Sequence, residues 1–447
     1  MQRSHLWPML LIAASAAAAQ DDKEATDLLE EPVTDEVAAP EAPRPPLGYL
    51  SDPNEAPKDF WDALVSGKIH FDDRLRFEFA ETTGKKPSYA FTNRLRLGYE
   101  TKAFYGFSGL AEFENVATPN SGLYSVPPAD QGDPDRTTIA DPRGTEINRI
   151  WGRYKTDGIG DTEIGLDAKG GRQRIIFDDQ RFVGNVGWRQ FEQTYDSARL
   201  TTDFGVERLT LDYTYVWGVQ RIFGPNGPNW DSDSHFLRAQ YQAIPELTLI
   251  PFAYLLDFRD DSPLDSVNSY GIRITGDIGR NVGDPSDTYF DYEATYAYQN
   301  DAGSNPVDFE AHFLALQARM TRKGLGAATL GYQLLGSDDG NFGFRFPLGT
   351  NHKFQGFADQ FLTTPAEGLQ DLYIAGKIDL PHDVTTSIIY HQFWTDEGGK
   401  DLGFEIDLVA TVKFTNFWSA LTKFAYFDGH NGQPDTVKFW IQTDIKF

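Results

Sequence analysis

The sequence predicts an all-β protein, specifically a transmembrane antiparallel β-barrel of about 18 strands, within a range of about 16 to 18. Segments with an apolar residue at every second position recur from about Lys68 to the end of the chain. The last segment ends in the aromatic residue Phe447, as the final strand of bacterial outer-membrane barrels commonly does. Short and long links alternate between the segments, which is typical of barrels with short periplasmic turns and long external loops.

The N-terminal region has the features of a secreted envelope protein. Residues 1–19 are predicted to be a signal peptide, because Arg3 and His5 precede an apolar run and small residues follow it. Residues 20–66 are predicted to be an acidic, Pro- and Ala-rich disordered periplasmic tail and lead-in, through which periplasmic partners could bind. No later run of roughly 18 apolar residues occurs, so strands would have to span the membrane.

Residues 67–447 are predicted to form the barrel. Its first strand has an apolar row of Ile69, Phe71, Leu75, Phe77 and Phe79 and a polar row of His70, Asp72, Arg74, Arg76 and Glu78. At the end of the chain, Phe439, Ile441 and Ile445 share one face and Lys438, Gln442 and Asp444 the other. The predicted long links are 115–143, 177–187, 219–233 and 337–368. A barrel of this size encloses water, so the sequence predicts a channel.

Composition narrows the function classes. The formal net charge of −26 argues against nucleic acid as a partner. Cysteine is absent, which excludes disulfides and thiolate metal sites, and no metal or other cofactor is expected. The predicted location is the bacterial outer membrane, with lipid and lipopolysaccharide around the barrel.

The polar rows contain many arginines for so acidic a chain. Turning an arginine toward lipid costs about 2–4 kcal/mol near the bilayer midplane, so these side chains are predicted to face the lumen. Guanidinium groups in a water-filled pore favour anions, and their planar donors suit carboxylates. The residues are Arg74, Arg76, Arg94, Arg96, Arg149, Arg153, Arg172, Arg174 and Arg189. The alternative interpretation is structural: pairs with carboxylates such as Glu78, Glu112 and Asp167 would stiffen the wall without selecting a solute.

Two segments, 171–190 and 350–361, the second followed by Thr364-Pro365 and Gly368-Leu369, resemble the signature of the alginate export family of outer-membrane proteins. The resemblance implies a monomeric barrel of about 18 strands. It also implies an arginine-lined constriction through which an anionic polyuronate diffuses passively, and it leaves open whether the polymer is exported or taken up. Family residues carried over to this chain would put Arg172, Arg174, Arg181 and Arg189 on or beside the conduit. His352, Lys353 and Asp359 would lie on a loop that folds toward it.

Two other functions compete with a polyuronate channel. A general diffusion porin for small anionic solutes would differ mainly in loop constriction and arginine density. An outer-membrane enzyme acting on glycans is less favoured, because adjacent acidic pairs such as Asp178-Asp179 point to opposite faces of a strand and cannot flank one bond. The acidic segments 231–233 and 338–341 are predicted to form turns in external loops rather than calcium sites. Replacing Arg172 or Arg174 with Ala is predicted to weaken anion preference.

Overall fold

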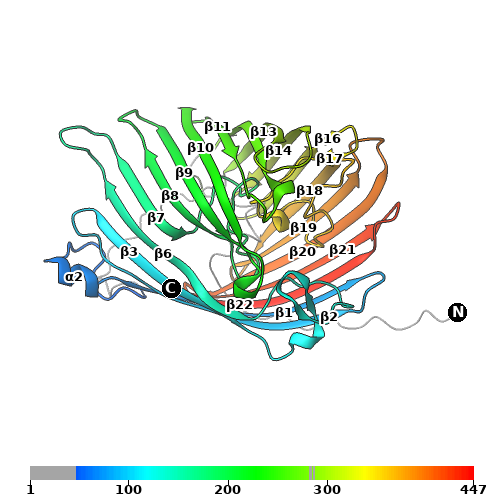
Figure 1. The fold of residues 1–447 in the computed structure, drawn as a ribbon, viewed down its shortest axis with the longest axis horizontal. Helices are drawn as coiled ribbons and strands as arrows, with labels where there is room; N and C mark the ends of the chain where they lie inside the picture. Colours follow the sequence, from blue (N-terminus) through cyan, green and yellow to red (C-terminus); the bar gives the residue numbers. More distant parts are fainter. Residues whose placement is uncertain (1–46, 281–283, 285–286) are drawn as a thin grey trace.

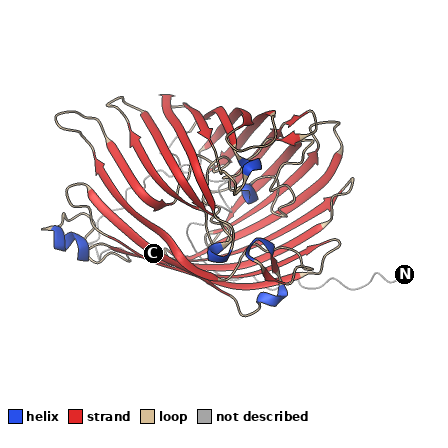
Figure 2. Cartoon of the chain, in the orientation of Figure 1, coloured by secondary structure: helices blue, strands red, loops and turns tan. Residues whose placement is uncertain are grey.

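The computed structural model describes residues 47–280, 284 and 287–447. The predicted signal peptide and most of the acidic tail, residues 1–46, lie outside the described residues. The predicted barrel is confirmed: 18 strands form one antiparallel sheet, and β1 pairs with β22 to close it (Figures 1 and 2).

The strands follow one another around the barrel in chain order. They are β1 (Lys68–Thr82), β2 (Ser88–Glu100), β3 (Phe107–Ala117), β6 (Gly144–Thr156), β7 (Leu166–Gln173), β8 (Thr194–Thr202), β9 (Leu209–Gln220), β10 (Trp230–Ile244), β11 (Leu247–Leu255), β12 (Val267–Ile278), β13 (Thr288–Asp301), β14 (Glu310–Arg322), β15 (Gly326–Leu335), β18 (Leu369–Leu380), β19 (Val384–Trp394), β20 (Asp401–Thr415), β21 (Trp418–Gly429) and β22 (Thr436–Lys446). Small hairpins β4 (Ser125–Val126) with β5 (Gln131–Gly132), and β16 (Ser337–Asp338) with β17 (Phe342–Gly343), lie in long loops.

Within the described residues, five single turns of 3-10 helix also lie in the loops. They are Ser121–Leu123, Pro127–Ala129, Gly224–Asn226, Pro263–Asp265 and Asn351–Lys353. In the described part of the chain, no helix has both the length and the apolar character needed to cross a bilayer.

The predicted alternation of faces holds along the closing seam of the barrel. On β22, Ile441 is 53% exposed whereas its neighbour Trp440 is fully buried. On β1, Leu75 is exposed and pairs with Thr443, while Arg76 is buried and pairs with Gln442. Apolar side chains therefore point outward toward lipid and the polar row points into the barrel.

The lead-in to the barrel differs from the prediction. Residues 47–66 were expected to be disordered, but they contain the helix α2 (Phe60–Val65), which is capped by Asp59. The Lys102 amide donates to the Ala63 carbonyl at 3.0 Å, and the Tyr99 hydroxyl donates to the Leu64 carbonyl at 2.7 Å. Barrel residues distant in sequence thus order a segment that composition alone marks as unstructured.

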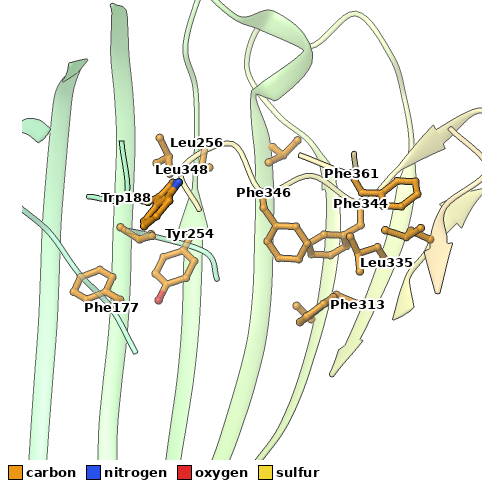
Figure 3. Close-up of a cluster of buried hydrophobic side chains, with 14 of the residues drawn as sticks. Phe177, Trp188, Tyr254, Leu256, Phe313, Leu335, Phe344, Phe346, Leu348 and Phe361 are labelled. Atoms are coloured by element: carbon orange, nitrogen blue, oxygen red, sulfur yellow. The ribbon is translucent and has the colours of Figure 1, made fainter. Parts of the chain in front are cut away.

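The interior of the barrel is largely filled by two long loops, 174–193 and 336–368, which fold inward and meet at the Val183↔Leu348 bridge. Figure 3 shows aromatic residues of both loops against the wall. Phe346 lies 4.9 Å from Phe344 and 5.0 Å from Phe313 of β14, measured between ring centroids. The hydrophobic core therefore lies inside the barrel, where a purely water-filled lumen was expected.

Of the two acidic segments predicted to form turns, one does and the other does not. Residues 338–341 form a turn, in which Asn341 N donates to Asp338 O at 2.9 Å, as predicted. Asp231, Ser232 and Asp233 lie within β10 instead of a turn, because their backbone pairs with β9 through a bulge. Across the described residues, no group of three His, Asp or Glu side chains is arranged to hold a metal ion.

Candidate conduit through the barrel

The arginines of β1 and β2 point inward as predicted, but the loop 174–193 covers them. Arg74 and Arg76 donate to the carbonyls of Gly187 and Trp188 at 2.9 and 2.6 Å. Arg94 pairs with Asp72, and Arg96 pairs with Glu114, each at 2.5 Å. All four guanidinium groups are buried, so the prediction that they line an open pore is wrong. Arg74, Arg76 and Arg96 hold the loop against the wall through its backbone carbonyls, whereas Arg94 pairs with the wall residue Asp72.

A group of charged and aromatic side chains joins both inward loops to the wall. We call it the anchor cluster, and its members are Arg76, Trp188, Arg189, His352, Asp359, Lys423 and Lys438. The Asp359 carboxylate accepts from Arg189 at 2.9 Å, Lys438 at 2.5 Å and His352 at 2.6 Å. Arg76 and Lys423 lie 4.1 and 3.8 Å from the Trp188 ring. Burial lowers the pKa of His352 well below its usual value, despite the Asp359 carboxylate, so the imidazole is neutral at pH 7.

Arg149, Arg153 and Arg174 fit the structural interpretation. Each makes a bidentate pair with one carboxylate: Arg149 with Glu112, Arg153 with Asp167 and Arg174 with Glu192. These side chains are partly exposed inside the barrel, and their charges are neutralised locally.

The position of Arg172 contradicts the prediction. It pairs in register with Ile150 and Asp196, and Ile150 is 50% exposed on the outward row. Its Nε donates to Asp196 Oδ1 at 2.8 Å at the loop end of β7. Arg172 therefore lies on the outer face of the barrel, where its charge is paired with Asp196, and does not line the conduit.

A large cavity lies on the opposite side of the interior, against strands β11 to β15. Its volume is about 470 Å³, and it extends toward the short β10–β11 link at Pro245 and Thr248. The charges that line it are balanced. Arg273 pairs with Asp179 and with Glu293, both at 2.7 Å, and Lys353 donates to the Asp179 carbonyl at 3.0 Å. This inner chamber is polar and close to neutral.

A separate, smaller cavity of about 110 Å³ lies nearer the long-loop end. Three arginines line it: Arg181, which also borders the inner chamber, Arg221 and Arg345. In the described part of the chain, the Nε atoms of all three have no hydrogen-bond partner, and none of the three forms an ion pair. Asp265 is the acidic residue in this lining. The lining of the outer chamber therefore carries more positive than negative charge, with three arginines and one aspartate.

Arg181 lies at the junction of the two chambers. Its guanidinium lies over the rings of Phe346 at 3.9 Å and Phe354 at 4.5 Å. Arg181 belongs to loop 174–193, and both rings belong to loop 336–368. Burial lowers the pKa of Arg181 to about 9 and that of Arg221 to about 10. Both values remain above neutral pH, so both groups stay charged and offer donors to an anion.

Arg181 and Lys353, two residues predicted to lie on or beside the conduit, line the inner chamber. The sequence did not point to Arg221, Arg273 or Arg345. Arg273 had a detectable signal, because it alternates with Ile272 and Ile274 on β12. Arg221 and Arg345 lie in loops, where no period assigns a face, so only the folded structure could place them.

The closed barrel with its outward apolar band and charged interior path defines an outer-membrane β-barrel channel protein. The family described as alginate export matches residues 126–398, which is more than half of the chain, and the protein belongs to this family. The chain matches none of the curated proteins with which it was compared.

Several solved structures share the fold. The chain is similar to Pseudomonas aeruginosa OccK9 (OpdG), with a TM-score of 0.65 and 12% identity over 86% of this chain and 100% of that one. For Acinetobacter baumannii OccAB2 the TM-score is 0.64, with 12% identity over 86% of this chain and 99% of that one. Pseudomonas aeruginosa OpdL gives a TM-score of 0.59 and 13% identity, covering 86% and 100%.

Proposed function

We propose that the protein is a passive channel for uronate-type anionic saccharides, which cross the barrel through the outer and inner chambers. The observation that carries this proposal is the set of three guanidinium groups in the outer chamber, Arg181, Arg221 and Arg345, that form no ion pair within the described residues. A solute carboxylate can supply the opposite charge that these groups lack, and guanidinium donors match its planar geometry.

In this proposal the outer chamber selects anions and the inner chamber allows their release. In the outer chamber, a carboxylate replaces its water shell with arginine donors, which favours an anion over a neutral sugar of equal size. In the inner chamber, carboxylates such as Asp179 and Glu293 balance the arginines, so an anion is held less tightly there. Conduction requires this combination, since a site that binds too strongly does not release its solute.

The channel is proposed to act as a monomer, and the path through both chambers needs no residue from a second copy of the chain. The small volume of the outer chamber, about 110 Å³, favours a second candidate, a general porin for small anions. A polymer would require the two inward loops to move aside, whereas a small anion would not.

Conductance across planar bilayers separates the candidates. Purified protein is measured in a KCl gradient, then with galacturonate oligomers or neutral oligosaccharides of equal length. The uronate channel is expected to show an anion-selective reversal potential and block by oligouronates at concentrations where neutral sugars have no effect. Equal block by neutral sugars would refute uronate recognition, and anion selectivity without oligouronate block would favour the general porin.

A further inference from the structure

An aromatic surface on the outside of the barrel, at the short-link end, has no role in conduction. It comprises Phe60, Trp61 and Val65 of α2 and Phe104, Tyr105 and Phe107 at the β2–β3 link. Trp61 is 72% exposed, Val65 67% and Tyr105 85%. Aromatic rings link the two parts, since the ring centroids of Phe60 and Phe104 are 6.3 Å apart.

The contacts that hold α2 show which way it faces. The Tyr99 hydroxyl donates to the Leu64 carbonyl, and on its strand Tyr99 pairs with Ala111 of β3. Leu97, two residues earlier in the same row, is 52% exposed, so Tyr99 also points outward. The helix is therefore fixed to the lipid-facing side of the wall. Figure 1 shows it at the edge of the barrel, beside β3.

The two faces of the segment differ in chemistry. Trp61 and Val65 are four residues apart and share one face of α2, with Phe60 beside them. Lys58, Asp59 and Asp62 supply charges at the start of the helix, and Ala63 is the buried contact with the barrel. The Lys102 amine donates to the carbonyls of Asp52 and Glu55 at 2.5 and 2.7 Å, which fixes the chain leading into the helix.

We propose that α2 and the β2–β3 link form an anchor that inserts its aromatic side chains into the periplasmic leaflet of the outer membrane, at the level of the phospholipid headgroups. The surface is continuous with the outward apolar row, since Phe107 is 64% exposed at the start of β3 and packs 4.7 Å from Tyr154 of β6. Aromatic side chains with a polar edge favour this zone, and an amphipathic helix lies along it. The proposal is independent of what the channel conducts.

Site-directed spin labelling of the full-length protein tests the anchor, and the absence of native cysteine makes each introduced label unique. V65C places a nitroxide on the apolar face, Y105C places one on the β2–β3 link, and K58C is the matched control on the polar side. The protein is reconstituted in phosphatidylethanolamine and phosphatidylglycerol vesicles. Collision of each label with oxygen, which concentrates in lipid, is compared with collision with a water-soluble nickel chelate.

We expect the oxygen-to-nickel ratio at V65C and Y105C to exceed that at K58C several-fold. In detergent-free vesicles, equal nickel accessibility at all three positions would overturn the proposal, because the surface would then face water. Dipolar broadening between labels at V65C, with nickel excluded, would also overturn it, because it would assign the surface to contact with a second copy of the chain.

Discussion

Replacing Arg181 tests the proposed path most directly, because this residue borders both chambers. Arg181→Gln removes the charge, and Arg181→Lys keeps a charge but removes the planar pair of donors. Hydrogen bonds to a charged group contribute about 1.5–3 kcal/mol, and each 1.4 kcal/mol is tenfold in affinity. The Gln variant is therefore expected to weaken block by oligouronates roughly 10- to 150-fold.

The two variants separate charge from geometry. We expect Arg181→Gln to shift the reversal potential in a KCl gradient toward that of a non-selective pore. Arg181→Lys is expected to keep most of that selectivity but to lose part of the oligouronate affinity, because an ammonium cannot pair with both carboxylate oxygens in the plane. The measurement is single-channel conductance in bilayers, with block titrated for each variant.

Arg172→Gln is the matched control. Arg172 belongs to the same segment, 171–190, as Arg181, but its side chain lies on the outer face of the barrel. It is expected to leave both reversal potential and block unchanged. The shift of electrophoretic mobility on heating verifies that each variant forms a folded barrel. If Arg181→Gln is folded but conducts and binds as the unaltered protein does, the assignment of the conduit is wrong.

Three further changes address the inward loops. Trp188→Ala removes a fully buried ring of the anchor cluster, at a cost of about 3–5 kcal/mol, and is expected to give larger, noisier conductance steps. Asp359→Asn leaves Arg189 and Lys438 without their shared carboxylate, which costs about 3–5 kcal/mol for a buried pair and should loosen the 336–368 loop, measured as faster protease cleavage within it. Gly356→Ala, at φ +82°, places a Cβ 2.3 Å from the Glu405 carboxyl and is expected to lower the barrel's thermal midpoint.

Each of these changes has a control in the chain. Trp217 is 43% exposed on the outward face, so Trp217→Ala should leave conductance noise unchanged. Asp339 is exposed at the tip of the 336–368 loop, and Asp339→Asn should not speed cleavage. Gly432 has a similar φ of +95° with no atom near its Cβ position, so Gly432→Ala isolates backbone strain from the Glu405 clash. Equal effects in a variant and its control would contradict the role assigned to that loop contact.

The sequence by itself determined the barrel, the approximate strand number and the face on which each strand residue lies. These follow from a period of two, which is local: Leu75 and Arg76 are adjacent, and their opposite faces are fixed by backbone geometry alone. The same alternation also accounts for Arg172. Strand β7 stays in register with β6 and β8 through this residue, and its neighbour Gln173 is buried inside, so Arg172 lies on the outer row with Ile150. The inward prediction was wrong because it followed from the charge of the residue and from the family resemblance, and not from the alternation of its own strand.

Only the tertiary structure decided which inward charges are available to a solute. Arg76 and Arg181 look alike in sequence, yet one is paired with Gln442 and the Trp188 carbonyl and the other has no ion-pair partner in the described residues. The difference arises because loops 174–193 and 336–368, far apart in the chain, meet inside the barrel, as in the 2.9 Å hydrogen bond from Thr350 to Gln180. Contacts over such separations depend on packing and charge pairing in three dimensions, which no local pattern encodes.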